Sequence, residues 1–111
     1  MTPVRSAIDA ARMQNAARQA TAALHALANE NRLLLLCQLS QGEQSVAELE
    51  ALLDIHQPTL SQQLGVLRAE GLVQTRRDGR RIYYSVADPK ILTLLNTLYS
   101  LYCPKPGKGR K

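Results

Sequence analysis

The chain has 111 residues, of which 45% are hydrophobic, and a formal net charge of +5. This length supports one domain, and its core must be built from aliphatic side chains because the sequence contains no Phe or Trp. No apolar stretch approaches the roughly 18 residues of a membrane span, and the N-terminus lacks the apolar segment of a secretory signal. We therefore expect a cytoplasmic protein with no membrane association.

Positive charge is concentrated in two short segments of the chain, RRDGRR and PKPGKGRK. Together they hold eight of the fourteen basic residues, namely Arg76, Arg77, Arg80, Arg81, Lys105, Lys108, Arg110 and Lys111. Clustered positive charge favours a polyanionic partner, although a solubilising surface would carry the same residues.

The N-terminal part of the chain predicts two helices. Residues 6–27 have helical periodicity, with one face of small and aliphatic side chains that another helix can approach closely. That face consists of Ala16, Ala20, Ala23, Leu24 and Leu27. The segment ENRLLLLCQLSQ predicts a second helix over about 30–41, with Gly42 as its C′ residue.

Two short helices follow, separated by a brief turn. Ser45 and Glu48 have the spacing of a capping box, which predicts a helix start in SVAELEALL. After a turn at about 54–57, Pro58 suits the first turn of the next helix and Gly71 suits its end. This arrangement has the spacing of a helix-turn-helix.

A hairpin and a last helix complete the predicted fold. Residues 72–75 and 81–86 are β-prone, and Asp78-Gly79 is typical of a type I′ hairpin turn. A helix over about 89–102 has more than one apolar face, so it needs a second packing partner, which we expect to be another copy of the chain. These elements predict a mainly α winged helix-turn-helix domain over 1–103. The basic tail over 104–111 is rich in Pro, Gly and Lys and is expected to be disordered.

The helix after the turn has the composition of a DNA-reading helix. Leu60, Leu64 and Leu67 share the face that would anchor it to the core, and Gln62 points the opposite way. An ordinary solvated helix face would usually carry Lys and Glu, whereas residues 59–67 carry no charge. Short polar and amide side chains suit base edges in the major groove, where Gln can pair with adenine. The candidate DNA-binding residues of this region are Gln57, Thr59, Ser61, Gln62 and Gln63.

Arginines around the hairpin turn form a second candidate DNA contact. Four of them surround Asp78-Gly79, and arginine suits phosphate contacts and narrow minor grooves. Arg68 is a weaker phosphate candidate, since it could equally pair along its own helix, and His56 fits a solvated turn as well as a DNA contact. The predicted phosphate contacts are therefore Arg68, Arg77, Arg80 and Arg81.

The sequence resembles the ArsR/SmtB family of bacterial winged-helix repressors from about Leu24 to Cys103. The most specific segment is QPTLSQQLGVLRAEGLV. The resemblance implies a homodimer joined through its first and last helices. It also implies binding to a palindromic double-stranded operator and release by an inducer.

The sequence has two cysteines, Cys37 in a leucine-rich helix and Cys103 at the end of the last helix. One metal site of the family uses paired cysteines on the third helix, and the other uses Asp, His and Glu ligands on the last helix. Here the third helix has no cysteine, and the last has Asp88 at its start but no histidine. Two cysteines cannot complete a tetrahedral zinc site, although they suit two-coordinate Cu(I). We expect no metal, with Cu(I) as the alternative.

The cysteine positions resemble the dithiol, sulfide-responsive branch of this family, which includes BigR and SqrR and is related to HlyU. In that branch one cysteine lies in the second helix and the other ends the last helix, as Cys37 and Cys103 do here. The resemblance implies that reactive sulfur species or oxidants join the two cysteines in an intrachain di- or polysulfide. Taken alone, Cys37 would instead be an inert buried thiol.

Two functions from other classes compete with a repressor. A thiol-disulfide or sulfur-transfer enzyme is disfavoured because the chain has no CxxC motif and no base adjacent to a nucleophile. The other alternative is a metal-binding protein with an incidental winged helix. We predict a repressor without enzymatic activity or cofactor.

Overall fold

The structure is a computed structural model and describes residues 7–103. Its helices are α1 (Ala7–Leu27), α2 (Glu30–Leu39), α3 (Val46–Leu53), α4 (Thr59–Ala69) and α5 (Pro89–Tyr102). Its strands are β1 (Gln44–Ser45), β2 (Val73–Asp78) and β3 (Arg81–Val86). The predicted winged helix-turn-helix is confirmed, with β1 as an additional element. The predicted tail over 104–111 lies outside the described residues, and no helix within 7–103 is long and apolar enough to cross a membrane.

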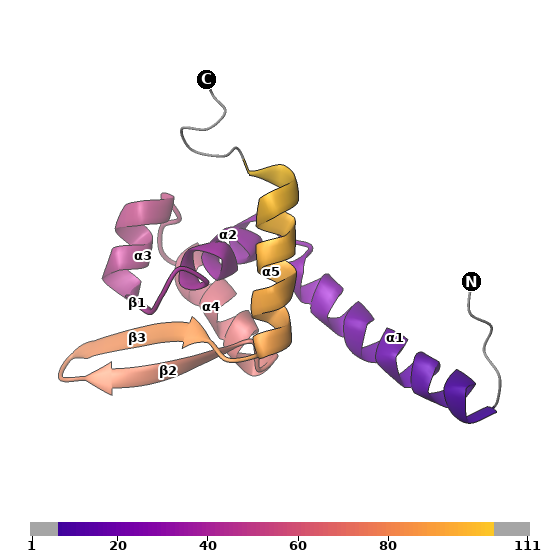
Figure 1. The fold of residues 1–111 in the computed structure, drawn as a ribbon. Helices are drawn as coiled ribbons and strands as arrows, with labels where there is room; N and C mark the ends of the chain where they lie inside the picture. Colours follow the sequence, from indigo (N-terminus) through magenta and orange to yellow (C-terminus); the bar gives the residue numbers. More distant parts are fainter. Residues whose placement is uncertain (1–6, 104–111) are drawn as a thin grey trace, which may run out of the picture.

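Aliphatic side chains from α2, α3, α4 and α5 form the core. The largest fully buried side chains are Leu35, Leu36, Leu49, Leu60, Leu64, Leu67, Ile91 and Leu95. Burial of each such side chain contributes about 1.5–3 kcal/mol. By contrast, among residues 9–27 of α1 only Ala26 and Leu27, in the last turn, are buried, and Figure 1 shows the helix extending away from the other elements.

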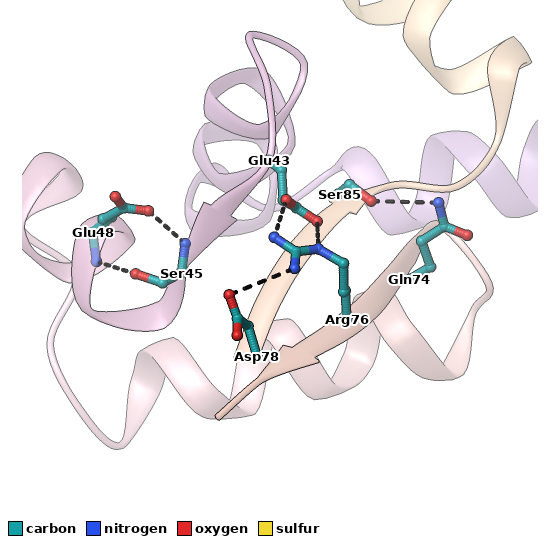
Figure 2. Close-up of polar contacts among 7 residues, drawn as sticks. All are labelled: Glu43, Ser45, Glu48, Gln74, Arg76, Asp78 and Ser85. Carbon is teal, nitrogen blue, oxygen red and sulfur yellow. Dashed lines mark hydrogen bonds and ion pairs between the residues drawn. The ribbon is translucent and has the colours of Figure 1, made fainter. Parts of the chain in front are cut away.

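Local hydrogen bonds set the ends of two helices as predicted. The Ser45 side chain accepts a hydrogen bond from the Glu48 N–H at 3.1 Å, and the Glu48 carboxylate accepts one from the Ser45 N–H at 2.8 Å (Figure 2). This pair of bonds is a capping box at the start of α3. At the end of α4, Gly71 has a φ of +77°, and the Leu72 N–H donates to the Leu67 carbonyl at 3.0 Å, as in a Schellman motif.

Two helix boundaries differ from the prediction. α2 is shorter than 30–41 because Ser40 is its C-cap, so Gly42, with a φ of +147°, lies one position beyond C′. Pro58 is the N-cap of α4 rather than a member of its first turn, and its side chain makes no capping hydrogen bond.

The hairpin turn also differs from the prediction. Asp78 pairs with Arg81, so the two-residue turn consists of Gly79 and Arg80 instead of Asp78 and Gly79. Gly79 has a φ of +65° and Arg80 has no positive φ, which fits a type II′ turn and excludes type I′. β1 pairs with β3, giving the antiparallel order β1-β3-β2 and joining the hairpin to the segment that leads into α3.

Candidate nucleic-acid interface and cysteine site

α4 buries one face and presents a polar one. Its inward leucines are fully buried as predicted, and Arg68, which is exposed in the last turn, is its only charged residue. Ser61 and Gln62 are exposed, and Thr59 is half-buried. Within the part of the chain that the structure describes, the side-chain amide of Gln62 makes no hydrogen bond, so its donors and acceptor are available to an external partner.

Two of the predicted reading residues are engaged by the chain itself. The Gln57 side-chain oxygen accepts a hydrogen bond from the Ser61 N–H at 3.1 Å, which supplies the cap that Pro58 cannot provide. Gln63 is half-buried, and its Oε1 accepts a hydrogen bond from Arg32 Nη1 at 3.0 Å. Each side chain therefore has its oxygen oriented by a bond within the chain, while its amide N–H groups make no hydrogen bond to another residue between 7 and 103.

Three arginines are free around the hairpin turn. Arg77 lies on β2, Arg80 in the turn and Arg81 at the start of β3, and all three are exposed. None of them forms an ion pair with another residue between 7 and 103. Their positive charges are therefore available to a polyanion.

Arg76, which the sequence grouped with these three, is held by the chain instead. It donates to the Glu43 carboxylate from Nε at 3.0 Å and from Nη2 at 2.7 Å, as Figure 2 shows. Its guanidinium also lies 4.7 Å from the centroid of the Tyr83 ring and 4.0 Å from the Asp78 carboxylate. The hydrogen bond between Arg76 and Glu43 raises the pKa of Arg76 and lowers the pKa of Glu43. The hairpin therefore offers three arginines to a partner rather than four.

His56 lies in the turn between α3 and α4 and contacts acidic side chains. Its Nε2 is 2.7 Å from Asp54 Oδ1, and its Nδ1 is 3.8 Å from Glu50 Oε2. These neighbours favour a solvated turn over a DNA contact. No group of three or more His, Cys, Asp or Glu side chains able to hold a metal ion occurs among residues 7–103.

Cys37 and Cys103 line the same two cavities between α2 and the end of α5. The larger has a volume of about 450 Å³ and the smaller about 170 Å³. Both cysteines are free thiols and half-buried, and Cys103 is the C-cap of α5. Burial raises the pKa of the Cys37 thiol, and the charge of a Cys103 thiolate raises it further. The side chains that line both cavities are Leu33, Cys37, Tyr99 and Cys103.

α5 carries apolar side chains that the chain does not cover. Tyr99, Leu101 and Tyr102 are 45%, 69% and 80% exposed, while Ile91 and Leu95 are buried on the other side of the helix. A groove of about 670 Å³ also separates α5 from α1 and is lined mainly by alanine and leucine side chains. The prediction that this helix has more than one apolar face is confirmed.

Several known proteins are similar to this chain in sequence. Residues 29–75 match the family described as bacterial regulatory protein, arsR family. The biofilm growth-associated repressor of Agrobacterium fabrum is 52% identical over 91 residues, which cover 82% of this chain and 78% of that protein. The transcriptional activator HlyU of Vibrio cholerae is 38% identical over 91 residues, which cover 82% of this chain and 84% of that protein. Both relatives are named as regulators and not as enzymes.

Solved structures are similar in fold. The crystal structure of the transcriptional repressor BigR from Xylella fastidiosa has a TM-score of 0.79 and 45% identity, covering 85% of this chain and 96% of that one. Reduced HlyU from Vibrio cholerae has a TM-score of 0.80 and 38% identity, covering 84% and 98% of the two chains. A homodimeric winged helix-turn-helix DNA-binding domain from Mycobacterium bovis has a TM-score of 0.68 and 31% identity, covering 90% and 89%.

Proposed function

Because the chain belongs to the arsR family of bacterial regulatory proteins, we propose that it is a dimeric repressor whose DNA binding is controlled by Cys37 and Cys103. The observation that carries the proposal is the shared lining of two cavities by two free thiols. Repression is favoured over activation because identity to a named repressor is 52%, against 38% to a named activator.

A palindromic operator is the proposed DNA partner. The polar face of α4 would enter the major groove, with Gln62 as the principal base-reading residue because its amide is exposed and unpaired within 7–103. Arg77, Arg80 and Arg81 would contact phosphates or the minor groove, with Arg68 as a further phosphate contact. Thr59 and Ser61 border the same face, while Gln57 and Gln63 would contribute mainly through their N–H groups because their oxygens already accept a bond within the chain.

A second copy of the chain is the proposed protein partner. The apolar side chains of α5 and the groove between α1 and α5 are uncovered in one chain, and burying them would stabilise a pair. The homodimeric relative from Mycobacterium bovis supports this assembly. A dimer would place two α4 helices against the two half-sites of a palindrome.

The proposed sensing reaction begins at Cys103. Thiolates are the nucleophiles of sulfur chemistry, and the raised pKa of Cys37 leaves less of it ionised at neutral pH. The Cys103 thiolate attacks the outer sulfur of a persulfide RSSH, which forms Cys103–S–SH and releases RS⁻. The Cys37 thiolate then attacks the inner sulfur of that group, which forms a disulfide and releases HS⁻. If Cys37 has first been persulfidated in the same way, the second displacement gives a trisulfide.

Bridging would act on DNA binding by fixing α2 to the end of α5. α2 packs against α4, whereas α5 belongs to the proposed dimer face, so the bridge would link the reading helix to the dimer contact. Release requires that the bridged state bind the operator more weakly than the reduced state.

The test compares operator binding by the wild-type protein with that of Cys37→Ser and Cys103→Ser. We expect a persulfide donor to weaken wild-type binding about a hundredfold, which is about 2.7 kcal/mol of coupling. Both variants should bind as the untreated wild type does and should not respond, and mass spectrometry should find the bridge only in the wild type. Release of Cys103→Ser by the donor would contradict the paired-thiol mechanism, and release of the wild type by Cu(I) alone would assign a metal-responsive repressor.

A further inference from the structure

We propose that Arg32 is a positioning residue that ties the end of α1 to the reading helix α4, so that α1 sets the orientation of α4. The inference rests on two parts of the proposed function: α4 reads DNA, and α1 belongs to the dimer face. It assigns a role to Arg32, a residue outside both the cysteine site and the basic hairpin.

The Arg32 side chain bonds to two helices at once. Its Nε donates to the Ala26 carbonyl at 2.6 Å, and its Nη2 donates to the His25 carbonyl at 3.4 Å. Its Nη1 donates to Gln63 Oε1 at 3.0 Å. The backbone of Arg32 is itself fixed, because its N–H donates to the side chain of the N-cap residue Asn29 at 3.0 Å.

The first two bonds complete the C-terminal end of α1. His25 and Ala26 lie in the last turn of that helix, where carbonyls have no partner within the helix, although the His25 carbonyl also accepts from the Ala28 N–H at 3.2 Å. A positive guanidinium also suits the negative end of the helix dipole. Arg32 makes no ion pair with any other described residue, and its three side-chain acceptors are neutral oxygens that the fork of the guanidinium reaches together. A lysine ammonium is a point charge without that planar fork.

The third bond fixes the Gln63 side chain on α4. Arginine has only donors, so the amide oxygen of Gln63 must face Arg32 and its NH₂ group must point away. Both side chains are half-buried, which reduces competition from water for this bond. A side chain on the flank of the reading helix is thus held by the residue that caps α1.

The consequence for DNA binding concerns spacing. Two reading helices must match half-sites about 34–36 Å apart, so their orientation relative to the dimer face has to be defined. The three Arg32 side-chain bonds, which we call the clamp, would define the orientation of α4 relative to α1 within each chain. Loss of the clamp should therefore broaden the range of half-site spacings that the dimer accepts, in addition to any change in affinity.

The experiment uses a palindromic duplex that the wild-type protein selects from a randomised pool, together with versions whose spacer is one base pair shorter or longer. We expect the wild type to prefer the selected spacing about tenfold, the size of a single mismatched contact. Gln63→Leu removes the acceptor of the bond from α2 to α4, and Arg32→Lys lacks the planar fork that bonds α1 and α4 together. Both variants should reduce this preference to within about twofold. Gln63→Glu is the matched control, since its carboxylate can still accept from Arg32 and should keep the preference even if affinity falls.

The outcomes separate the clamp from the proposed function. A wild-type protein that selects no duplex would overturn the repressor itself. A folded Gln63→Leu protein with an unchanged spacing preference would overturn the clamp alone. Equal loss of spacing preference in Gln63→Glu and Gln63→Leu would also overturn the clamp, because the carboxylate of Gln63→Glu still accepts from Arg32. If Arg32→Lys does not fold, Gln63→Leu decides the question, because it leaves the two bonds to α1 in place.

Discussion

The helices α4 and α5 both have an apolar and a polar side, yet only α4 has all its large inward apolar side chains buried by its own chain. The inward leucines of α4 are fully buried, and its outer face is polar. α5 buries Ile91 and Leu95 on one side but leaves Leu101 and Tyr102 largely exposed on the other. Its last residue borders Cys103, the C-cap of the helix.

This difference indicates which part of the molecule can respond to a chemical signal. Moving α4 would disturb side chains packed at interior density, which costs several kcal/mol. Moving the end of α5 would disturb side chains that one chain leaves partly in water. A bond formed at Cys103 can therefore shift the end of α5 at a lower cost than it could shift the reading helix.

The largest expected effect is on the free energy of unfolding and tests the buried face of α4. Leu64→Ala should lower the free energy of unfolding by about 2–5 kcal/mol, because it leaves a cavity in the core. Leu101→Ala, on the exposed side of α5, should change it by less than about 0.5 kcal/mol within one chain. Urea denaturation at a protein concentration low enough for the chain to be monomeric measures both, and sedimentation at higher concentration should show a weaker dimer for Leu101→Ala. Similar losses of stability in the two variants would break the comparison.

The next effect concerns the outer face of α4. Gln62→Ala should weaken operator binding by about 1–3 kcal/mol per half-site, since it removes base hydrogen bonds without touching the core. Its melting temperature should stay at the wild-type value. Binding to random-sequence DNA serves as the control and should hardly change. Equal weakening on operator and random DNA would remove Gln62 from base reading.

The smallest effect extends the comparison to the hairpin, where Arg76 is engaged by Glu43 while Arg80 and Arg81 are free. Replacing Arg80 and Arg81 by Ala should weaken binding to every sequence. It should also flatten the dependence of log affinity on log salt by about one unit per lost phosphate contact. Arg76→Ala should leave that slope unchanged, because its charge already faces a carboxylate. A slope change of about one unit for Arg76→Ala, the size of one lost phosphate contact, would contradict this division.

Features of the fold that depend on near neighbours could be predicted from the sequence. The capping box of Ser45 and Glu48 and the glycine at the end of α4 are set by residues a few positions apart. The inward leucines of α4 follow from helical spacing alone. The sequence places the turn one residue too early, because Asp-Gly indicates a hairpin but does not fix the register, which depends on pairing along the whole of β2 and β3.

The parts of the site that were missed depend on contacts between distant segments. The bond from Arg32 to Gln63, the pairing of Arg76 with Glu43 and the pairing of β1 with β3 join residues far apart in the chain. No local pattern indicates such partners, so the sequence alone groups Arg76 with the other three arginines around the hairpin turn. The two cysteines were placed together only through the family resemblance, and the structure brings them to shared cavities.

The polar outer face of α4 has a consequence for how such a chain can evolve. The side chains of Ser61 and Gln62 are exposed and support no buried contact, and surface substitutions of this kind usually change stability by less than about 0.5 kcal/mol. A duplicated gene could therefore acquire a new target sequence through a few changes there without approaching the threshold at which folding fails. Gln63, one position further along, lacks this freedom because its oxygen is already bonded to Arg32.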